Sequence, residues 1–260
     1  MADPGEVLKD LADESRELDD LATEAEWSTP TPAKGWAIAH QIAHLAWTDA
    51  RALIAVRSPE EFPAEVQRAL AAGDGFVDRG ARELAAKPRE EVLAQWRSGR
   101  AELASALARV PPGQKIPWFG PPMSATSMAT ARLMETWAHA QDVYDALGLR
   151  REPTRRLRQI ARFGVRTRDF AFSVHGLAVP PDEFRVELSG VDGTQWTFGP
   201  EEAAQRVTGS ALGFCLVVTQ RRHPADTDVI AVGPDAEKWL EIAQAFAGPP
   251  GSGRKAGQFA

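Results

Sequence analysis

The residues of this chain best suited to metal chemistry are histidines and one glutamate in two apolar segments. His40 and His44 lie four residues apart in "WAIAHQIAHLAW", and Glu135 and His139 lie four apart in "METWAHAQD". Residues at i and i+4 share one face of a helix, so each pair projects from one side of its segment. Two imidazoles and a carboxylate are a ligand set of catalytic zinc, which keeps a further position open.

An ordinary structural role for these residues is the alternative. A His-X3-His pair arises by chance on many amphipathic helices, with each ring hydrogen-bonded to a backbone carbonyl or to a neighbouring side chain. Glu135 would then form an ion pair, for which Arg132 is available one turn away. A motif of this kind is a hypothesis until its structural context is known.

The first half of the chain must supply the helices that carry these side chains. Hydrophobic residues recur there at helical spacing, and stretches rich in proline and glycine, such as "PPGQKIPWFGPP", separate the segments. We expect helices over 5–25, 36–57, parts of 62–86, 88–110 and 124–148. Short connections between amphipathic helices predict an antiparallel bundle of about four, in whose core ligands from facing helices can converge.

The second half changes character and predicts a smaller α+β domain. Residues 154–177 still look helical, whereas "FRVEL", "QWTFG" and "DVIAV" read as short strands. "EEAAQRVTGSALGFCLVV" is expected to be helical in part, and "PDAEKWLEIAQAFAG" to be a closing helix. We therefore expect a helical bundle over 1–152, an α+β domain over 153–248 and a flexible tail over 249–260.

Composition and charge exclude several classes of function. The 30 basic residues are scattered among 36 acidic ones, so nucleic-acid binding has no electrostatic footprint. No apolar run approaches the roughly 20 residues of a membrane helix, and the acidic N-terminus lacks the apolar core of a signal peptide. Cys215 is the single cysteine and lies in an apolar run, which favours a buried structural thiol and a reducing compartment. We expect a cytoplasmic monomer or homodimer.

A family resemblance supplies context for the histidines. "GWAIAHQIAHLAWTD" and, later, "ARLMETWAHAQDV" resemble the N-terminal domain of mycothiol-dependent maleylpyruvate isomerases, which are DinB-like four-helix-bundle metalloproteins. The family pattern is a tryptophan, a histidine in "AHL" on the second helix, and Glu-X3-His-X2-Asp on the last helix. In this chain the residues of that pattern are Trp36, His44, Glu135, His139 and Asp142.

The second half resembles the same family more weakly. "VTGSALGFCLVVTQRR" and "DVIAVGPDAEKWLEIAQAFAG" are similar to its sterol-carrier-like C-terminal domain, so the resemblance covers nearly the whole chain. It implies a divalent metal held by His44, Glu135 and His139, with zinc first and nickel or cobalt as alternatives. Water or a thiol would take the open position. Because the chain has no suitable cysteine, the thiol would be a low-molecular-weight cosubstrate, which the resemblance implies to be mycothiol.

His40 departs from the family pattern, in which this position is more often acidic. One turn before a ligand, it could be a fourth ligand, a hydrogen-bond partner of a ligand, or a general base. A supporting or packing role is favoured, because a fourth protein ligand would close the site. Asp142, one turn beyond His139, can accept a hydrogen bond from a ring nitrogen of a ligand. A salt bridge between the first and last helices is the alternative for Asp142.

Substrate-binding residues are predicted by approximate position only. The family's isomerase holds a dicarboxylate substrate with arginines, for which Arg82 in the third-helix region and Arg222 in the second domain are candidates. A solvated surface position is the alternative for each of them. Trp118, in the proline-rich loop, is the best candidate among the tryptophans for lining a pocket that binds the cosubstrate or substrate.

The predicted function is that of a metal-dependent, mycothiol-dependent thiol transferase or isomerase. It would act on a small electrophilic metabolite through a metal-bound thiolate, because coordination to a metal deprotonates a thiol. One alternative is a hydrolase or tailoring enzyme that needs no thiol, since the same metal activates water. The other alternative is a non-catalytic protein with a structural metal and an apolar ligand, which a fourth ligand such as His40 would favour.

Overall fold

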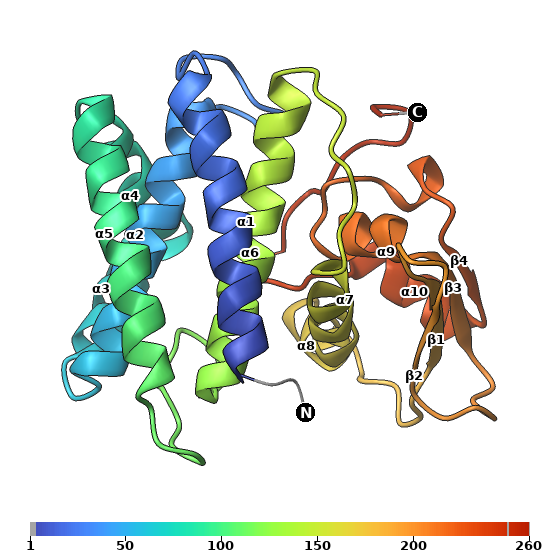
Figure 1. Cartoon of the computed structure of the whole chain (residues 1–260). Coiled ribbons are helices and arrows are strands. Elements are labelled where there is room, and N and C mark those ends of the chain that lie inside the picture. Colours follow the sequence, from blue (N-terminus) through green and yellow to red (C-terminus); the bar gives the residue numbers. More distant parts are fainter. Residues whose placement is uncertain (1–3, 249, 260) are drawn as a thin grey trace. The chain divides into compact units, whose positions relative to one another are not determined.

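The computed structural model describes residues 4–248 and 250–259, with only the backbone of Asp74. The chain divides into two compact units between Arg151 and Glu152. The first is helical, and the second combines helices with a small sheet (Figure 1). Among the described residues, no helix has the length and apolar character needed to cross a membrane.

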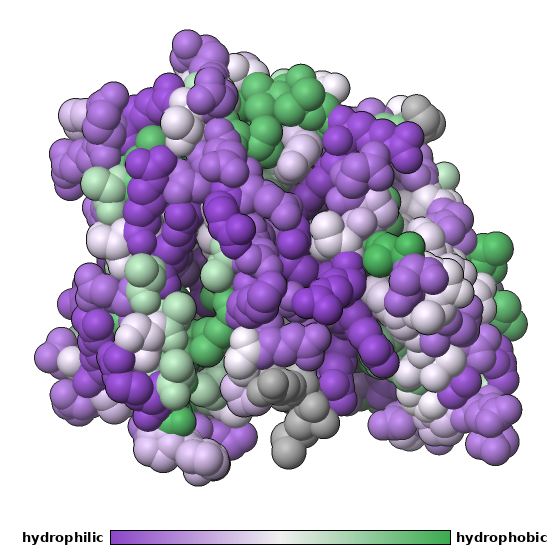
Figure 2. Space-filling view, in the orientation of Figure 1, coloured by the Kyte–Doolittle hydropathy of each residue, from purple (hydrophilic) through white to green (hydrophobic). Residues whose placement is uncertain are grey.

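Four long helices make the frame of the first unit. They are α1 (Pro4–Glu24), α2 (Ile38–Arg57), α5 (Arg89–Ala108) and α6 (Ala125–Ala146). Each of α1 and α2 packs against both α5 and α6. Apolar residues at helical spacing are buried between the helices, and the face seen in Figure 2 is mainly hydrophilic. Ser124 caps the start of α6, the helix that carries Glu135 and His139, and its hydroxyl accepts a hydrogen bond from the Ser127 N–H.

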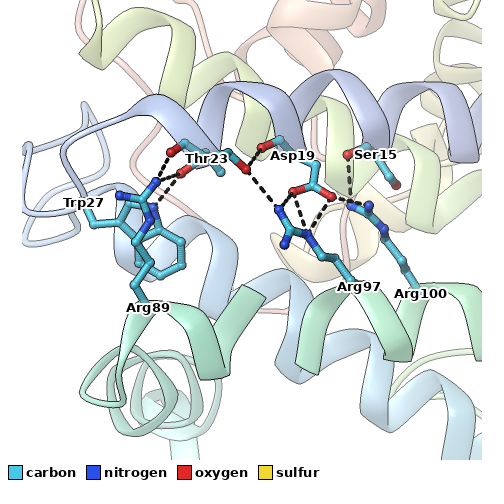
Figure 3. A network of polar contacts seen from close by, with 8 residues as sticks. Ser15, Asp19, Thr23, Trp27, Arg89, Arg97 and Arg100 are labelled. Atoms are coloured by element: carbon cyan, nitrogen blue, oxygen red, sulfur yellow. Dashed lines mark hydrogen bonds and ion pairs between the residues drawn. The ribbon is translucent and has the colours of Figure 1, made fainter. Parts of the chain in front are cut away.

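Arginines of α5 hold α1 in place (Figure 3). Arg97 Nη2 donates to Asp19 Oδ1 at 2.6 Å, and Arg100 Nη1 donates to the Ser15 carbonyl oxygen at 3.0 Å. Higher residue numbers on α5 thus meet lower numbers on α1, so these two helices are antiparallel. Burial of Asp19 raises its pKa, but the hydrogen bonds and charges of Arg97 and Arg100 outweigh burial and leave the pKa below its ordinary value.

α2 and α5 run in the same direction, so the prediction of a wholly antiparallel bundle is wrong. Arg57, the last residue of α2, pairs with Glu102 towards the end of α5, with Nη1 and Oε2 2.6 Å apart. The reason lies in their connection, where the single helix expected within 62–86 is two helices, α3 (Phe62–Ala72) and α4 (Phe76–Ala85). A 3-10 turn, η1 (Gly73–Gly75), joins them, and α4 returns the chain along α2 before α5 begins.

Ionisable side chains lie between two hydrophobic clusters of the bundle. One cluster uses α2 as far as Trp47 and α6 from Ala140 onward, and the other uses α2 from Ala52 and α6 as far as Ala129. Asp49 on α2 and residues 132–139 on α6 fall between these limits. We call this region the polar layer of the bundle. A buried charge is costly unless it is paired, so each ionisable side chain in the polar layer needs a partner.

Asp49 and Arg132 form a buried ion pair in this layer. Arg132 Nε donates to Asp49 Oδ1 at 2.8 Å, and both side chains are almost fully buried. Burial raises the pKa of Asp49 although the guanidinium opposes the shift. Arg132, the arginine available to Glu135 by spacing, is therefore engaged by Asp49, and Glu135 faces histidines.

The second unit is a four-stranded sheet with helices before, between and after its strands. The helices are α7 (Leu157–Arg166), α8 (Arg168–Val174), α9 (Ala211–Val218), the 3-10 turn η2 (Pro224–Asp226) and α10 (Pro234–Ile242). The strands are β1 (Arg185–Ser189), β2 (Gln195–Phe198), β3 (Arg206–Ser210) and β4 (Ile230–Val232), in the order β2-β1-β3-β4. The central pair β1 and β3 is parallel, and both outer pairs are antiparallel.

Two details of the second unit differ from expectation and one agrees. The segment expected to be helical in part contains α9, but it also contains β3, which was not predicted. In β3 only Val207 is buried, so the alternation that marks a strand is weak. α10 ends at Ile242, earlier than the predicted closing helix. Cys215 is fully buried and burial raises the pKa of its thiol, so the prediction of a buried thiol is confirmed.

We expect Arg132→Met to lower the free energy of unfolding by about 3–5 kcal/mol, because it leaves the Asp49 carboxylate buried without its partner. Replacing both residues, Asp49→Leu with Arg132→Met, should recover most of that loss. Urea denaturation followed by circular dichroism measures the effect. Arg57→Met is the control, since its half-exposed pair with Glu102 should contribute at most about 1 kcal/mol. Equal losses in the two single variants would contradict the assignment.

Candidate metal centre

His44, Glu135 and His139 bring three potential ligand atoms together, all within 4.8 Å of one another. His44 Nε2 lies 3.2 Å from Glu135 Oε2, and His139 Nε2 lies 3.3 Å from the same oxygen. The antiparallel packing of α2 on α6 makes this possible, because it sets His44 opposite the one-turn pair on α6. Glu135 and His139, which the sequence spaces four apart, are therefore close to each other and to His44 in the structure.

The distances among these three residues fit a small divalent cation. Zinc binds histidine nitrogen and carboxylate oxygen at about 2.0–2.2 Å, so neighbouring ligands of a tetrahedral site are about 3.3–3.6 Å apart. The observed separations of 3.2 and 3.3 Å are close to that range. Both Nε2 atoms lie next to the same carboxylate oxygen, so a single ion can contact all three ligand atoms.

The charge state of Glu135 also suits a ligand. Burial of the side chain raises its pKa, but hydrogen bonds with His139 and His44 outweigh burial and hold the pKa well below its ordinary value. The carboxyl group is therefore ionised at neutral pH. A metal ligand must be in this deprotonated form.

Gln41 supports His139 and was missed by sequence reasoning. Its Oε1 lies 2.5 Å from His139 Nδ1, on the side of the ring opposite Glu135. Gln41 is fully buried and lies three residues before His44, so the two side chains share one face of α2. The available signal was an uncharged polar residue in an otherwise apolar helix, on the face that carries a ligand.

Trp36 packs over the histidine rings. Its ring centroid lies 5.6 Å from that of His44 and 6.1 Å from that of His139, nearly parallel to the latter. Trp36 Nε1 donates to Asp78 Oδ1 at 2.6 Å, and Arg82 Nε donates to Asp78 Oδ2 at 2.7 Å. Arg82 is thus an exposed residue of α4 that holds Asp78, and through it Trp36.

His40 lies beside the three converging residues and outside their group. Its Nδ1 accepts a hydrogen bond from the Ala37 N–H at 3.1 Å, which satisfies a backbone donor at the start of α2. Burial lowers the pKa of His40, the charge of Arg82 lowers it further, and Asp78 opposes the shift. These contacts agree with a supporting role and give no sign of a fourth ligand.

The other predicted site residues are placed as follows. Asp142 is buried on α6, one turn beyond His139, and His139 Nδ1 lies 2.5 Å from Gln41 Oε1. Trp118 is half-buried and stacks on Phe62 with ring centroids 5.7 Å apart. Arg222 belongs to the second unit, where its guanidinium lies 3.9 Å from the centre of the Phe259 ring.

We expect the pKa of His40 to respond in opposite directions to two substitutions. Arg82→Gln should raise it by removing a nearby positive charge, and Asp78→Asn should lower it by removing a negative one. Because the folded-state pKa lies below the unfolded value, the contribution of His40 to stability should decline as the pH falls below 6.5. NMR titration of the ring protons measures the pKa, and shifts of the same sign in both variants would contradict the stated causes.

Comparisons with known proteins agree with this architecture. The sequence profile of the family described as "Mycothiol maleylpyruvate isomerase N-terminal domain" matches residues 8–144, more than half of the chain. A second profile, "Wyosine base formation", matches residues 180–232. Two uncharacterized proteins of Mycobacterium tuberculosis, from strains CDC 1551 / Oshkosh and ATCC 25618 / H37Rv, are each 58% identical over 258 residues, covering 98% of this chain and 100% of the relative.

Two solved structures share the fold. They are the crystal structures of the mycothiol-dependent maleylpyruvate isomerase and of a histidine-to-alanine mutant of that enzyme, with TM-scores of 0.59 and 0.61. Each is 15% identical to this chain, and each comparison covers 90% of this chain and 96% of the other. The helical unit followed by a small sheet unit is therefore an arrangement that this chain has in common with the isomerase. On the profile match and the relatives together, the chain belongs to the mycothiol maleylpyruvate isomerase N-terminal domain family.

Proposed function

We propose that this protein is a metal-dependent, mycothiol-dependent thiol transferase or isomerase acting on a small electrophilic metabolite. The observation that carries the proposal is the convergence of two imidazole nitrogens on one carboxylate oxygen in a largely buried layer. The names of the two structural neighbours, which are mycothiol-dependent isomerases, support a thiol as the cosubstrate. A reducing compartment, the cytoplasm, suits a reaction that consumes or recycles a thiol.

The proposed metal ligands are His44, Glu135 and His139. Two nitrogens and one oxygen favour zinc, with cobalt or nickel as alternatives, and three protein ligands leave a position for a cosubstrate. A divalent cation bound there would favour the thiolate form of a coordinated thiol at neutral pH. His40 would leave that position open, because a neutral ring whose Nδ1 accepts from the Ala37 N–H carries its proton on Nε2 and has no free lone pair for a metal.

The chain's own groups would orient the reactants. Trp36 covers one side of the histidine rings and limits the access of water there, and Asp78 holds Trp36 through its indole N–H. With Nδ1 of His40 accepting a hydrogen bond, the neutral ring carries its proton on Nε2. His40 would therefore act as a hydrogen-bond donor to a substrate oxygen, and the general-base alternative loses support.

The remaining predicted residues keep proposed roles. Arg82 would bind a substrate carboxylate, since a guanidinium suits bidentate contacts with a carboxylate. The same role for Arg222 of the second unit stays a prediction from the sequence. Trp118 would contribute apolar surface to the binding site, and Asp142 would support the ligand-bearing face of α6.

The reaction class follows from the nucleophile. A thiolate that adds to an activated double bond forms a carbon–sulfur bond and turns the double bond into a single one, about which the adduct can rotate. Elimination of the thiolate then restores the double bond in the other geometry, with no net change in atoms. If elimination does not follow and the adduct carbon is protonated, the product is a stable thioether and the reaction is a transfer.

We expect the protein purified without chelator to contain about one divalent ion per chain, as a three-ligand site requires. His139→Ala should lose the ion, with metal affinity reduced at least about 100-fold, because a direct ligand is removed where even supporting residues contribute 10–100-fold. Plasma mass spectrometry and chelator competition provide the measurements. The control is His223→Ala, which alters a histidine of the second unit. Retention of the ion by His139→Ala, or its loss from His223→Ala, would contradict the assignment.

We expect cis–trans isomerisation of maleylpyruvate, or thioether formation with another small electrophile, to require both mycothiol and the metal. The activity should fall by at least about 100-fold in Glu135→Gln, since removal of one preorganised electrostatic group commonly costs that much. Absorbance spectroscopy and mass spectrometry follow the two products. Ester or amide hydrolysis at the same rate with and without mycothiol would replace this proposal with the thiol-independent alternative.

A further inference from the structure

We infer that Gln41 is a positioning residue that fixes which nitrogen of His139 faces the metal. The inference deepens the proposed function, because it concerns a supporting contact of the proposed metal site. It rests on a chain of hydrogen bonds in which each donor and acceptor can be assigned. The chain runs from the loop before α2, through Gln41, to His139.

The chain begins at Thr31, in the loop that leads to Trp36. The Thr31 hydroxyl donates to the carbonyl oxygen of Trp36 at 3.0 Å, and the Thr31 backbone N–H donates to the same oxygen at 2.8 Å. A hydroxyl carries one proton, so only lone pairs remain on the Thr31 oxygen for any other contact. Gln41 Nε2, 2.9 Å from that oxygen, must therefore be a donor.

This assignment orients the amide of Gln41. The two ends of an amide are hard to tell apart by shape, and the hydrogen-bond network decides between them. With Nε2 donating to Thr31, Oε1 faces His139 Nδ1 at 2.5 Å. The reverse orientation would set the amide oxygen against the lone pairs of the Thr31 hydroxyl. The network therefore permits one orientation of Gln41.

The orientation of Gln41 then fixes the proton of His139. An amide oxygen can only accept, so Nδ1 of His139 must carry the hydrogen. In the neutral ring, Nε2 is left with its lone pair, and Nε2 is the atom 3.3 Å from Glu135 Oε2. Without a metal, Nε2 can carry a second proton and donate it to Glu135; a bound metal would take the place of that proton. In both cases Nδ1 keeps its proton and donates it to Gln41, which reserves Nε2 as the atom that faces the metal.

His44 lacks a comparable support among the described residues. Its Nδ1 is buried with no hydrogen-bond partner there, whereas its Nε2 faces Glu135 at 3.2 Å. The two histidines therefore differ in how they are held, because Nδ1 of His139 has a side-chain partner and Nδ1 of His44 has none among the described residues. Because Gln41 is fully buried, water cannot substitute for its contact with His139.

The test compares zinc affinities measured by chelator competition. Gln41→Leu should weaken zinc binding about 10–100-fold, as loss of a supporting contact to a metal-ligating histidine does. Gln41→Glu keeps an acceptor for Nδ1 but loses the donor to Thr31, so its zinc affinity should lie between those of Gln41→Leu and the wild type. The control is Gln141→Leu, a buried glutamine on α6 whose amide donates to Asp145 Oδ1 at 2.9 Å. Its zinc affinity should not change.

A second measurement needs no metal and separates this inference from the proposed function. Nitrogen-15 NMR of the metal-free protein, labelled at histidine, reports which ring nitrogen of His139 carries the proton. We expect a protonated Nδ1 in the wild type and in Gln41→Glu, and loss of this preference in Gln41→Leu. Should Gln41→Leu not fold, Thr31→Val removes the hydroxyl at the start of the chain and should shift the preference in the same direction.

The outcomes are distinguishable. A wild-type protein that binds no zinc but keeps the proton on Nδ1 would overturn the proposed function and leave the role of Gln41 in orienting the ring intact. A metal-free wild-type His139 without a proton on Nδ1 would overturn the inference, whatever the metal data. So would a folded Gln41→Leu variant with wild-type zinc affinity, or an equal loss of affinity in Gln141→Leu.

Discussion

The structure of the bundle depends on pairing polar groups from α2 with partners on α6 inside a hydrophobic core. Charged and polar groups buried without partners are costly, and each of these finds its partner across the helix interface. Asp49 meets Arg132, His44 meets Glu135, and Gln41 meets His139. The packing of the two helices and the assembly of the candidate metal centre are therefore one and the same event.

The charged residues of the polar layer form two groups, an ion pair and a candidate metal centre. Asp49 and Arg132 neutralise each other, which leaves the carboxylate of Glu135 to the imidazoles. Had Arg132 turned towards Glu135, the carboxylate would be neutralised by a guanidinium and would be a weaker ligand for a cation. Because Asp49 binds Arg132, the guanidinium does not neutralise Glu135, and the Glu135 carboxylate keeps its charge for a cation. Trp36, held by Asp78, packs against the rings of His44 and His139.

Much of this arrangement could be predicted from the sequence, for reasons that are local. Spacing of four placed Glu135 and His139 on one face, and apolar periodicity located the four long helices. The break at Gly73 and the parallel course of α2 and α5 could not be predicted. Periodicity indicates a helix, but it does not indicate the direction in which a neighbouring helix runs. β3 was missed because only Val207 in it is buried. Gln41 was missed because its partner is 98 residues away, and an uncharged amide carries no motif.

The three facing pairs advance in step, with the residue numbers rising on α2 as they fall on α6. Insertion or deletion of one residue between Gln41 and Asp49 would rotate one end of α2 by about 100° relative to the other. At least one of the facing pairs would then lose its partner, since a single helix cannot present both ends to α6. This stretch can therefore change the chemical identity of its side chains but not its length without losing a facing pair.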